Sequence, residues 1–448
     1  MMSHDPSART PSSDGNPDQP RASESRLSRR SFVVAAVSVG GSAGLSACMG
    51  TESVPDLPQG PSDLSSLPVR QHAWNDVLKT DAYGNHIQPR HRVLLLLDLR
   101  DPGQPGPDAR ERVETTLRKI ERAYPRSPEG LLFTVSYSRA YFDRFEENLP
   151  ESVDLPEPRA LAPFEDPSLD RPDAVLHLAS DYGQVVLEAE RALMGEQDAL
   201  NGVPVGDGLS DVFERSDRRT GFVGDGLPKE HEDVDGIPDS TPISEDAPMF
   251  MGFESGFKQN QATEDRVTIQ SGPFEGGTTQ QLSTIRLHLD QWYDQDSRYH
   301  REASMFCPHL ADEDAIEGTG ENLGASSGMA RCPAHTDQEL AASAQEEGIV
   351  GHSQKMVRAR EESRPRLLRR DVNSTDGDHA GLHFLSLQRE ITDFIETREA
   401  MNGTDLAADT PVGQRADNGI LQYFSVTRRG NYLVPPRDRR ALPTPAGD

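Results

Sequence analysis

The chain has 448 residues, enough for about two or three domains that each bury a core. Its 74 Asp and Glu residues outnumber its 46 Lys and Arg residues, which leaves a formal net charge of −28. A field of this sign repels nucleic acid and anionic lipid, so both are excluded as electrostatic partners. The acid is spread along the chain and the basic side is almost all arginine, which favours a halophilic protein; an acidic mesophilic protein or a disordered acidic tail is the alternative.

Residues 1–50 have the pattern of an export signal. After a polar start without periodicity, SRRSFVVAAVSVGGSAGLSACMG places Arg29 and Arg30 before an apolar run of about fifteen residues. This run is too short and too rich in glycine and serine for a stable membrane span. The segment resembles a twin-arginine signal, a route that exports folded proteins, often with a cofactor already inserted.

The same segment ends in LSAC at Cys48, which resembles a lipobox, although a lone cysteine after small residues can arise by coincidence. We therefore expect an exported protein at the cell surface, held to the outer face of the cytoplasmic membrane by a lipid on Cys48 and by nothing else. Residues 51–70 are rich in proline and serine and are predicted to be a tether.

Residues 71–200 are predicted to form a first domain of alternating strands and helices. Continuous apolar runs such as RVLLLLDL indicate buried strands, and segments with helical periodicity separate them. Strands are predicted at Arg92–Leu99, Gly130–Tyr137 and Asp173–Ala179, and helices at Asp108–Ala123, Ala140–Glu147 and Gly183–Met194. This order is that of a ferredoxin-like unit.

Residues 201–247 are rich in Gly, Asp and Pro and are predicted to be an irregular connection. A second domain, residues 248–448, repeats the pattern around a polar insertion at 305–347. Strands are predicted at Gly277–Leu289 and Gly381–Arg389, and helices at Asp290–Ala303 and Glu390–Met401. The predicted fold class is α+β, with two ferredoxin-like domains of the dimeric α/β-barrel type and antiparallel sheets.

Several motifs occur in an order that matches one known family. Leu131–Leu193, which begins LLFTVSYSRAYFDRF, is followed by GFESG at Gly252–Gly256, GHSQKMVRARE at Gly351–Glu361, LLRRD at Leu367–Asp371 and then GLHFLSLQRE. Over most of residues 71–440 the chain resembles the dye-decolorizing (DyP-type) haem peroxidases. The resemblance implies haem b as cofactor, and hydrogen peroxide and a small reductant as substrates. Whether the chain forms a homo-oligomer is left open.

The resemblance also implies roles for single residues. His352 would be the axial ligand of the haem iron, and Arg369 or its neighbour Arg370 would present a guanidinium group to peroxide on the distal side. The alternatives are an ordinary surface histidine and a solvated basic pair.

The family's distal aspartate falls on Ser255, which cannot accept a proton as a carboxylate does. Three outcomes are open: Glu254 replaces it, Asp225 in GFVGDG replaces it, or the acid is lost and the arginine acts alone. Gly252 and Gly256 fit a loop lying close over a porphyrin, and also fit a plain tight turn.

The insertion contains Cys307, His309, Cys332 and His335, a set that suits tetrahedral zinc or a copper ion. A disulfide between the two cysteines is the alternative. The expected function is an exported haem peroxidase. The alternative is a non-catalytic haem- or metal-binding surface lipoprotein that retains this fold without the distal acid.

Overall fold

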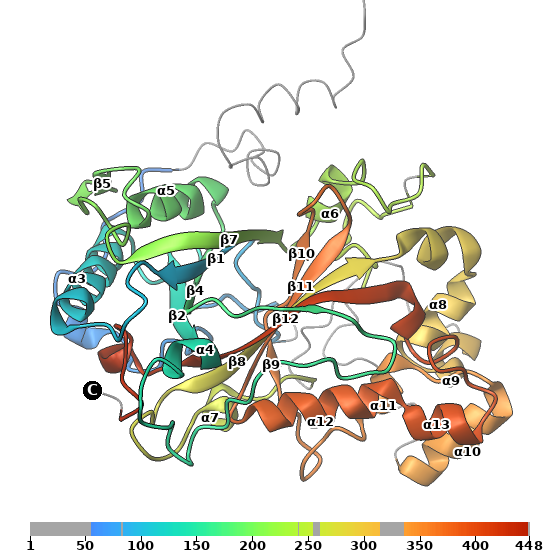
Figure 1. Ribbon diagram of the computed structural model, residues 1–448. Helices are drawn as coiled ribbons and strands as arrows, with labels where there is room; N and C mark the ends of the chain where they lie inside the picture. Colours follow the sequence, from blue (N-terminus) through green and yellow to red (C-terminus); the bar gives the residue numbers. More distant parts are fainter. Residues whose placement is uncertain (1–54, 82–83, 241, 254–259, 314–335, 447–448) are drawn as a thin grey trace, which may run out of the picture. The chain divides into compact units, whose positions relative to one another are not determined.

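The structure is a computed structural model that describes residues 55–81, 84–240, 242–253, 260–313 and 336–446 (Figure 1). The twin-arginine segment and Cys48 lie outside these ranges, as do Glu254, Ser255, Gly256, Cys332 and His335. All described residues belong to one compact unit. Within them, no helix has the length and apolar character needed to cross a bilayer.

The first half is a ferredoxin-like unit, as predicted. Its strands are β1 (His91–Leu99), β2 (Leu132–Ser138), β4 (Ala174–Ser180) and β7 (Phe213–Phe222). They pair antiparallel in the order β7-β1-β4-β2. Helix α3 (Pro107–Ala123) connects β1 to β2, and α5 (Gly183–Leu193) follows β4.

Strand β7 lies in the segment that was predicted to be an irregular connection. Its sequence, FERSDRRTGF, hides the strand pattern because its middle is charged. Arg215 and Arg218 both pair with the carboxylate of Glu190 on α5, at 2.9 and 2.7 Å, and Arg219 pairs with Asp170 at 2.7 Å. Ion pairs therefore hold the middle of this strand, while Phe213 and Phe222 at its two ends are buried in the core.

The second half repeats the same strand order. Its strands are β8 (Thr278–Leu287), β9 (Leu368–Arg369), β10 (Val372–Ser374), β11 (Gly381–Gln388) and β12 (Phe424–Val434). Strand β8 pairs with β12 on one side and with β11 on the other, and β9 and β10 both pair with β11. The second strand of this unit is thus broken between Arg369 and Val372.

Two seams close the sheet into a barrel. Strand β2 pairs with β12 at Ser138 and Tyr432, and β10 pairs with β7 at Asn373 and Phe222. The barrel has two apolar faces because alternate residues of a strand point to opposite sides. On β1, for example, Leu94 and Leu96 belong to the interior cluster, whereas Val93, Leu95 and Leu97 pack in the outer core with α3 and α5.

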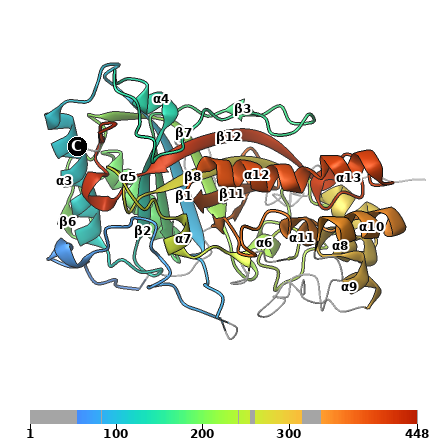
Figure 2. The same cartoon turned by 90° about the horizontal axis from the view of Figure 1, so that it is seen from below.

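The helices of the second half gather on the outer face of β8, β11 and β12 (Figure 1). They are α8 (Arg298–Met305), α9 (Pro308–Asp312), α10 (Asp337–Glu347), α11 (His352–Met356), α12 (Ile391–Asn402) and α13 (Thr404–Asp409). Figure 2 shows them at the end of the unit opposite α3. The predicted helix at Asp290–Ala303 is instead a π-helical turn at Gln291–Gln295 followed by α8, because the Ser297 hydroxyl caps a new helix start at the backbone N–H of His300.

Short elements complete the described chain. They are β3 (Ser168–Leu169), β5 (Ala199–Leu200), β6 (Val203–Pro204), α4 (Arg139–Phe142), α6 (Leu227–Glu230) and α7 (Glu264–Val267), together with 3₁₀ turns at Leu64–Ser66, Leu421–Tyr423 and Arg437–Arg439. Helix α4 is shorter than predicted.

Candidate functional site

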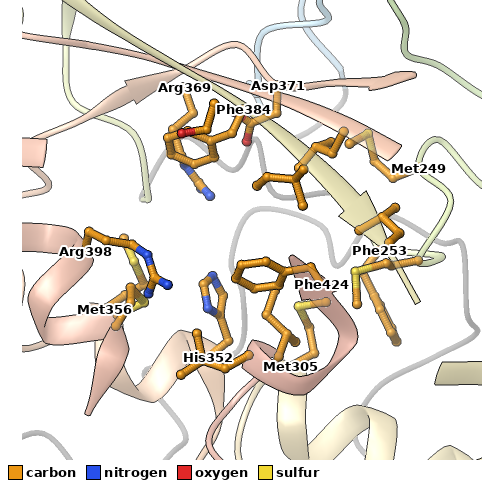
Figure 3. A pocket seen from close by; sticks show the side chains of 18 of the residues that line it. Met249, Phe253, Met305, His352, Met356, Arg369, Asp371, Phe384, Arg398 and Phe424 are labelled. Carbon is orange, nitrogen blue, oxygen red and sulfur yellow. The ribbon is translucent and has the colours of Figure 1, made fainter. Parts of the chain in front are cut away.

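A largely apolar cavity of about 200 Å³ lies between the outer face of the second-half strands and the helices that cover them (Figure 3). Its apolar lining includes Met249, Phe250, Met251, Phe253, Ile285, Leu287, Met305, Phe306, Met356, Leu367, Leu382, Phe384, Phe394, Met401, Ile420, Leu421, Phe424 and Val426. Polar groups reach it at a few points, and the ionisable ones are His352, Arg369, Asp371, Arg398 and Arg429. A largely apolar ligand with a few polar groups suits such walls.

His352 is the first residue of α11 and lines this cavity. Helix α11 begins there because Gly351, its N-cap, lies against the backbone at the C-terminal end of α8. A Cβ atom at Gly351 would stand 1.8 Å from the carbonyl oxygen of Phe306. The side chain of Gln354 accepts a hydrogen bond from the backbone N–H of Gly351 at 2.7 Å. Tertiary contact, not helix propensity, therefore fixes the position of this five-residue helix.

Lys355 ties α11 to its surroundings from the other side. Its side chain is fully buried, and Nζ donates to the carbonyl oxygen of Met401, at 2.7 Å, and to both the carbonyl and the side-chain oxygen of Asn418, at 2.9 and 2.6 Å. Burial lowers the pKa of Lys355 well below its ordinary value, and Arg398 and Arg358 act in the same direction. These three hydrogen bonds hold α11 against α12 and against the loop before β12.

The imidazole of His352 is neutral at neutral pH. Burial lowers its pKa to about 3, and the positive charges of Lys355, Arg369 and Arg398 add to the effect. A neutral ring nitrogen is what a transition metal requires of a histidine ligand. The side chain points into the cavity (Figure 3).

Arg369 and Asp371 reach the cavity from the wall opposite His352 (Figure 3). They lie two residues apart in extended chain, so their side chains share one face of the barrel wall. Arg370 lies between them and faces the interior of the barrel, where its guanidinium carbon is 4.1 Å from the ring centre of Trp74. Arg369 is thus the one of the two predicted arginines that lines the cavity.

Backbone hydrogen bonds hold this wall in place. The side chain of Gln261 accepts from the backbone N–H of Arg369 at 2.8 Å and donates to the carbonyl oxygen of the same residue at 3.4 Å. Oδ1 of Asp371 accepts from the backbone N–H of Leu385 at 3.2 Å. The Asp371 carboxylate is therefore fixed to the neighbouring strand β11 beside the cavity.

Two further arginines line the cavity and share one buried carboxylate. Nη2 of Arg398 lies 2.8 Å from Oε1 of Glu165, and Nη1 of Arg429 lies 2.8 Å from Oε2. The Glu165 side chain is 2% exposed. Burial raises its pKa, but the charge of Arg398 and the hydrogen bonds and charge of Arg429 outweigh burial, so the pKa is lowered and the group is an anion.

Other predicted site residues lie elsewhere. Asp225 is exposed and does not line the cavity. Gly252 has a φ of +83°, which suits glycine, and the adjacent Phe253 lines the cavity, so the start of GFESG borders the site. The remainder of that motif, including Glu254, Ser255 and Gly256, lies outside the described residues.

The Cys/His metal site receives no support. Cys307 is buried at the start of α9, whereas the side chain of His309 is exposed and pairs with Glu313 at 3.3 Å. Among the described residues, no group of three or more His, Cys, Asp and Glu side chains could hold a metal ion. The N-terminal end of α9 places Cys307 inward and His309 outward, and the other two predicted ligands, Cys332 and His335, lie outside the described residues.

The donor set fits a haem. One neutral imidazole reaches an apolar space from one wall, and a guanidinium and a carboxylate reach it from the other. His352 would ligate the iron, the Met and Phe side chains would pack on the ring, and Arg398 could meet a carboxylate of the ligand, since its Nη1 is buried and has no hydrogen-bond partner in the described structure.

Two ferredoxin-like halves closed into one barrel, with a cavity on the outer face of the second, define a known fold. The encapsulated DyP-type peroxidase from Mycobacterium smegmatis is similar at a TM-score of 0.52 and 13% identity, covering 83% of this chain and 99% of that one. A putative DyP-type peroxidase from Shewanella oneidensis is similar at a TM-score of 0.51 and 15% identity, covering 79% and 94%. The chain therefore has the fold of the DyP-type peroxidases.

The sequence itself matches a narrower group. The model of a family described as a family of unknown function, DUF7405, matches residues 89–436, and the chain belongs to this family. No curated protein matches it.

Proposed function

We propose that the protein is a haem-dependent peroxidase of the DyP type, which uses hydrogen peroxide to oxidise a small reductant. The observation that carries the proposal is the opposition of His352 to Arg369 and Asp371 across one apolar cavity. A bound haem b would supply the iron through which two electrons pass from the reductant to the peroxide.

The side chains opposite His352 would handle the peroxide. Reduction of H₂O₂ to two waters consumes two electrons and two protons and breaks the O–O bond. The Asp371 carboxylate would accept the proton of the nearer peroxide oxygen and return it to the oxygen that leaves as water. The Arg369 guanidinium would stabilise the negative charge on that leaving oxygen.

Asp371 offers a carboxylate in place of Ser255. Among the described residues it is the carboxylate that lines the cavity, two positions after the arginine, whereas Glu254 lies outside the described residues. Proton transfer therefore does not depend on Glu254 or Asp225 in this proposal. Arg398 and Arg429 would orient an anionic ligand group, and the apolar walls would exclude water.

Peroxide-dependent oxidation of a dye by the haem-loaded protein tests the proposal. We expect Arg369→Leu and Asp371→Asn each to retain haem and to slow the reaction with peroxide by roughly 10²–10³-fold. Arg366→Leu is the matched control, because Arg366 pairs with Asp393 at 3.1 Å and does not line the cavity. Equal loss in all three variants, or none in the first two, would contradict the assigned roles.

The second candidate is a haem-binding surface protein without peroxidase activity. It is favoured by Ser255, which stands where the resemblance to the DyP-type peroxidases implies an aspartate. It predicts that wild-type protein binds haem, reacts with peroxide no faster than free haem, and is unaffected by Asp371→Asn.

A further inference from the structure

One end of the barrel interior holds a buried, cationic cluster that the candidate active site does not use. It consists of Arg92 on β1, His177 on β4 and Arg370 after β9, covered by His72 and Trp74 of the segment that precedes the first strand. Each of these five residues is at most 3% exposed. The Trp74 ring contacts three of them: its centre is 5.5 Å from the guanidinium carbon of Arg92, 4.1 Å from that of Arg370 and 5.2 Å from the His177 ring.

Several N–H donors of this cluster have no partner. Nη2 of Arg92 donates to the side-chain oxygen of Gln88 at 3.1 Å, but in the described structure its Nε and Nη1 are buried without a hydrogen-bond partner. Nη2 of Arg370 donates to the carbonyl oxygen of His72 at 2.7 Å, and its Nε is likewise buried without a partner. An unpaired buried donor is costly, and more so when it is charged, so this arrangement calls for an acceptor.

The protein supplies too little negative charge here. Among the described side chains, Glu264 forms an ion pair with Arg370, at 3.3 Å, and no carboxylate forms one with Arg92. Asp181 acts on Arg92 through its charge at longer range, and its own Oδ1 accepts from the backbone N–H of Arg90. Burial and, to a smaller extent, the charge of Arg370 lower the pKa of Arg92 to about 9. Stacking on Trp74 stabilises a desolvated cation but gives the N–H groups no acceptor.

The two histidines do not change this balance. Burial lowers the pKa of His72 to about 3 and that of His177 well below its ordinary value, so both rings are neutral near pH 7. His72 shares a hydrogen bond of 2.8 Å with the Thr268 hydroxyl through Nε2, and its Nδ1 is buried without a partner. Neutral imidazoles can donate to an anion, but they cannot neutralise the arginines.

We propose that a monovalent anion of halide size binds between Arg92 and Arg370 inside the barrel. The anion would accept hydrogen bonds from the unpaired guanidinium N–H groups and would supply the negative charge that the two arginines lack. It would thereby link three parts of the chain: β1, the break between β9 and β10, and the segment 71–78. The site lies on the inner face of the barrel, whereas the cavity beside His352 lies on the outer face. The proposal therefore does not depend on haem or on peroxidase activity.

Bromide is the probe, because its anomalous X-ray scattering identifies it against water. Crystals of the full chain grown in sodium bromide should show an anomalous peak within hydrogen-bond distance of Arg92 Nη1 or Nε. In solution, the Tm of the wild type should rise by roughly 2 °C for each tenfold increase in chloride or bromide above the dissociation constant. It should not rise in sodium gluconate at equal ionic strength, because gluconate is too large to enter.

Arg92→Met should abolish the difference in Tm between halide and gluconate solutions. Arg112→Met, which removes an exposed arginine paired with Asp211 at 2.9 Å, should preserve this difference. If Arg92→Met does not fold, the anomalous peak and the Tm values of the wild type are sufficient to test whether the anion binds. A water in place of the anomalous peak, or equal Tm values in bromide and gluconate, would overturn the proposal.

Discussion

At the scale of single residues, the cavity depends on Glu165 as much as on the groups that face a ligand. Its carboxylate compensates two guanidinium groups, those of Arg398 and Arg429, whose side chains are 9% and 2% exposed. Its Oε2 also accepts from the backbone N–H of Leu161 at 2.9 Å. Removing one partner of a buried ion pair is costly because the remaining charge has no solvent.

We therefore predict that Glu165→Gln lowers the free energy of unfolding by about 3–5 kcal/mol, measured by urea denaturation. Glu399→Gln is the control, since Glu399 is 56% exposed and 3.8 Å from Arg159. That change should stay within about 0.5 kcal/mol of wild type. Similar stabilities for the two variants would show that Glu165 does not carry the compensating charge.

The sequence allowed His352 and Arg369 to be named as cavity residues through the order of motifs, and both line the cavity. Asp371 was within reach of the same reasoning, because residues two apart in an extended segment share a face and 369 and 371 are such a pair. The resemblance instead points to the glycine-rich motif at Gly252–Gly256 for the acid. Glu165 could not be found from sequence, because it lies 233 positions from Arg398, one of the two arginines it pairs with.

At the scale of elements, the apolar strands were predictable and the polar or very short ones were not. Strand β1 is a run of buried Leu and Val, and β11 matches its prediction within one residue. Strand β7 carries its buried charges in ion pairs, and β9 and β10 have only two and three residues. Helix α11 has five residues and no periodicity to detect, so its existence depends on contacts with α12 and with Phe306.

The contact at Gly351 gives a direct prediction for α11. Gly351→Ala places a Cβ 1.8 Å from a backbone oxygen, so the start of the helix must move. We expect a loss of about 1–3 kcal/mol in unfolding free energy and weaker haem binding, because His352 follows directly. Gly106→Ala at the N-cap of α3, where a Cβ would meet nothing within 4 Å, should change stability by less than about 1 kcal/mol. A normal haem affinity for Gly351→Ala would mean that this contact does not position His352.

At the scale of the whole molecule, long-range ion pairs hold the C-terminal segment to the first half. Glu121 on α3 pairs with Arg437 at 2.7 Å and with Arg440, more than 300 positions later. Burial acts to raise the pKa of Glu121, but these two arginines outweigh it and hold the pKa below its ordinary value. The two halves could be predicted from local patterns, whereas such contacts and the two seams between the halves could not.

The ion pairs of Glu121 predict how the stability of the protein depends on pH. Because the folded pKa of Glu121 is lower than the unfolded one, its contribution is complete above the ordinary value near 4.5 and is lost as pH falls below it. Glu121→Gln should lower stability at pH 7 and flatten the fall in unfolding free energy between about pH 5 and 3. Glu111→Gln, at an exposed position of the same helix, should leave the slope unchanged. Parallel pH profiles for wild type and Glu121→Gln would refute the assignment.

The most direct test is an absorption titration of the full chain with haem. We expect a Soret band that saturates at one haem per chain. In His352→Ala this band should be lost, or haem binding should weaken by more than about tenfold, while the far-UV circular dichroism stays unchanged. His309→Ala, which removes an exposed histidine, should titrate like wild type. A wild-type chain that binds no haem, or a His352→Ala variant with an unchanged spectrum, would contradict the assignment of this cavity.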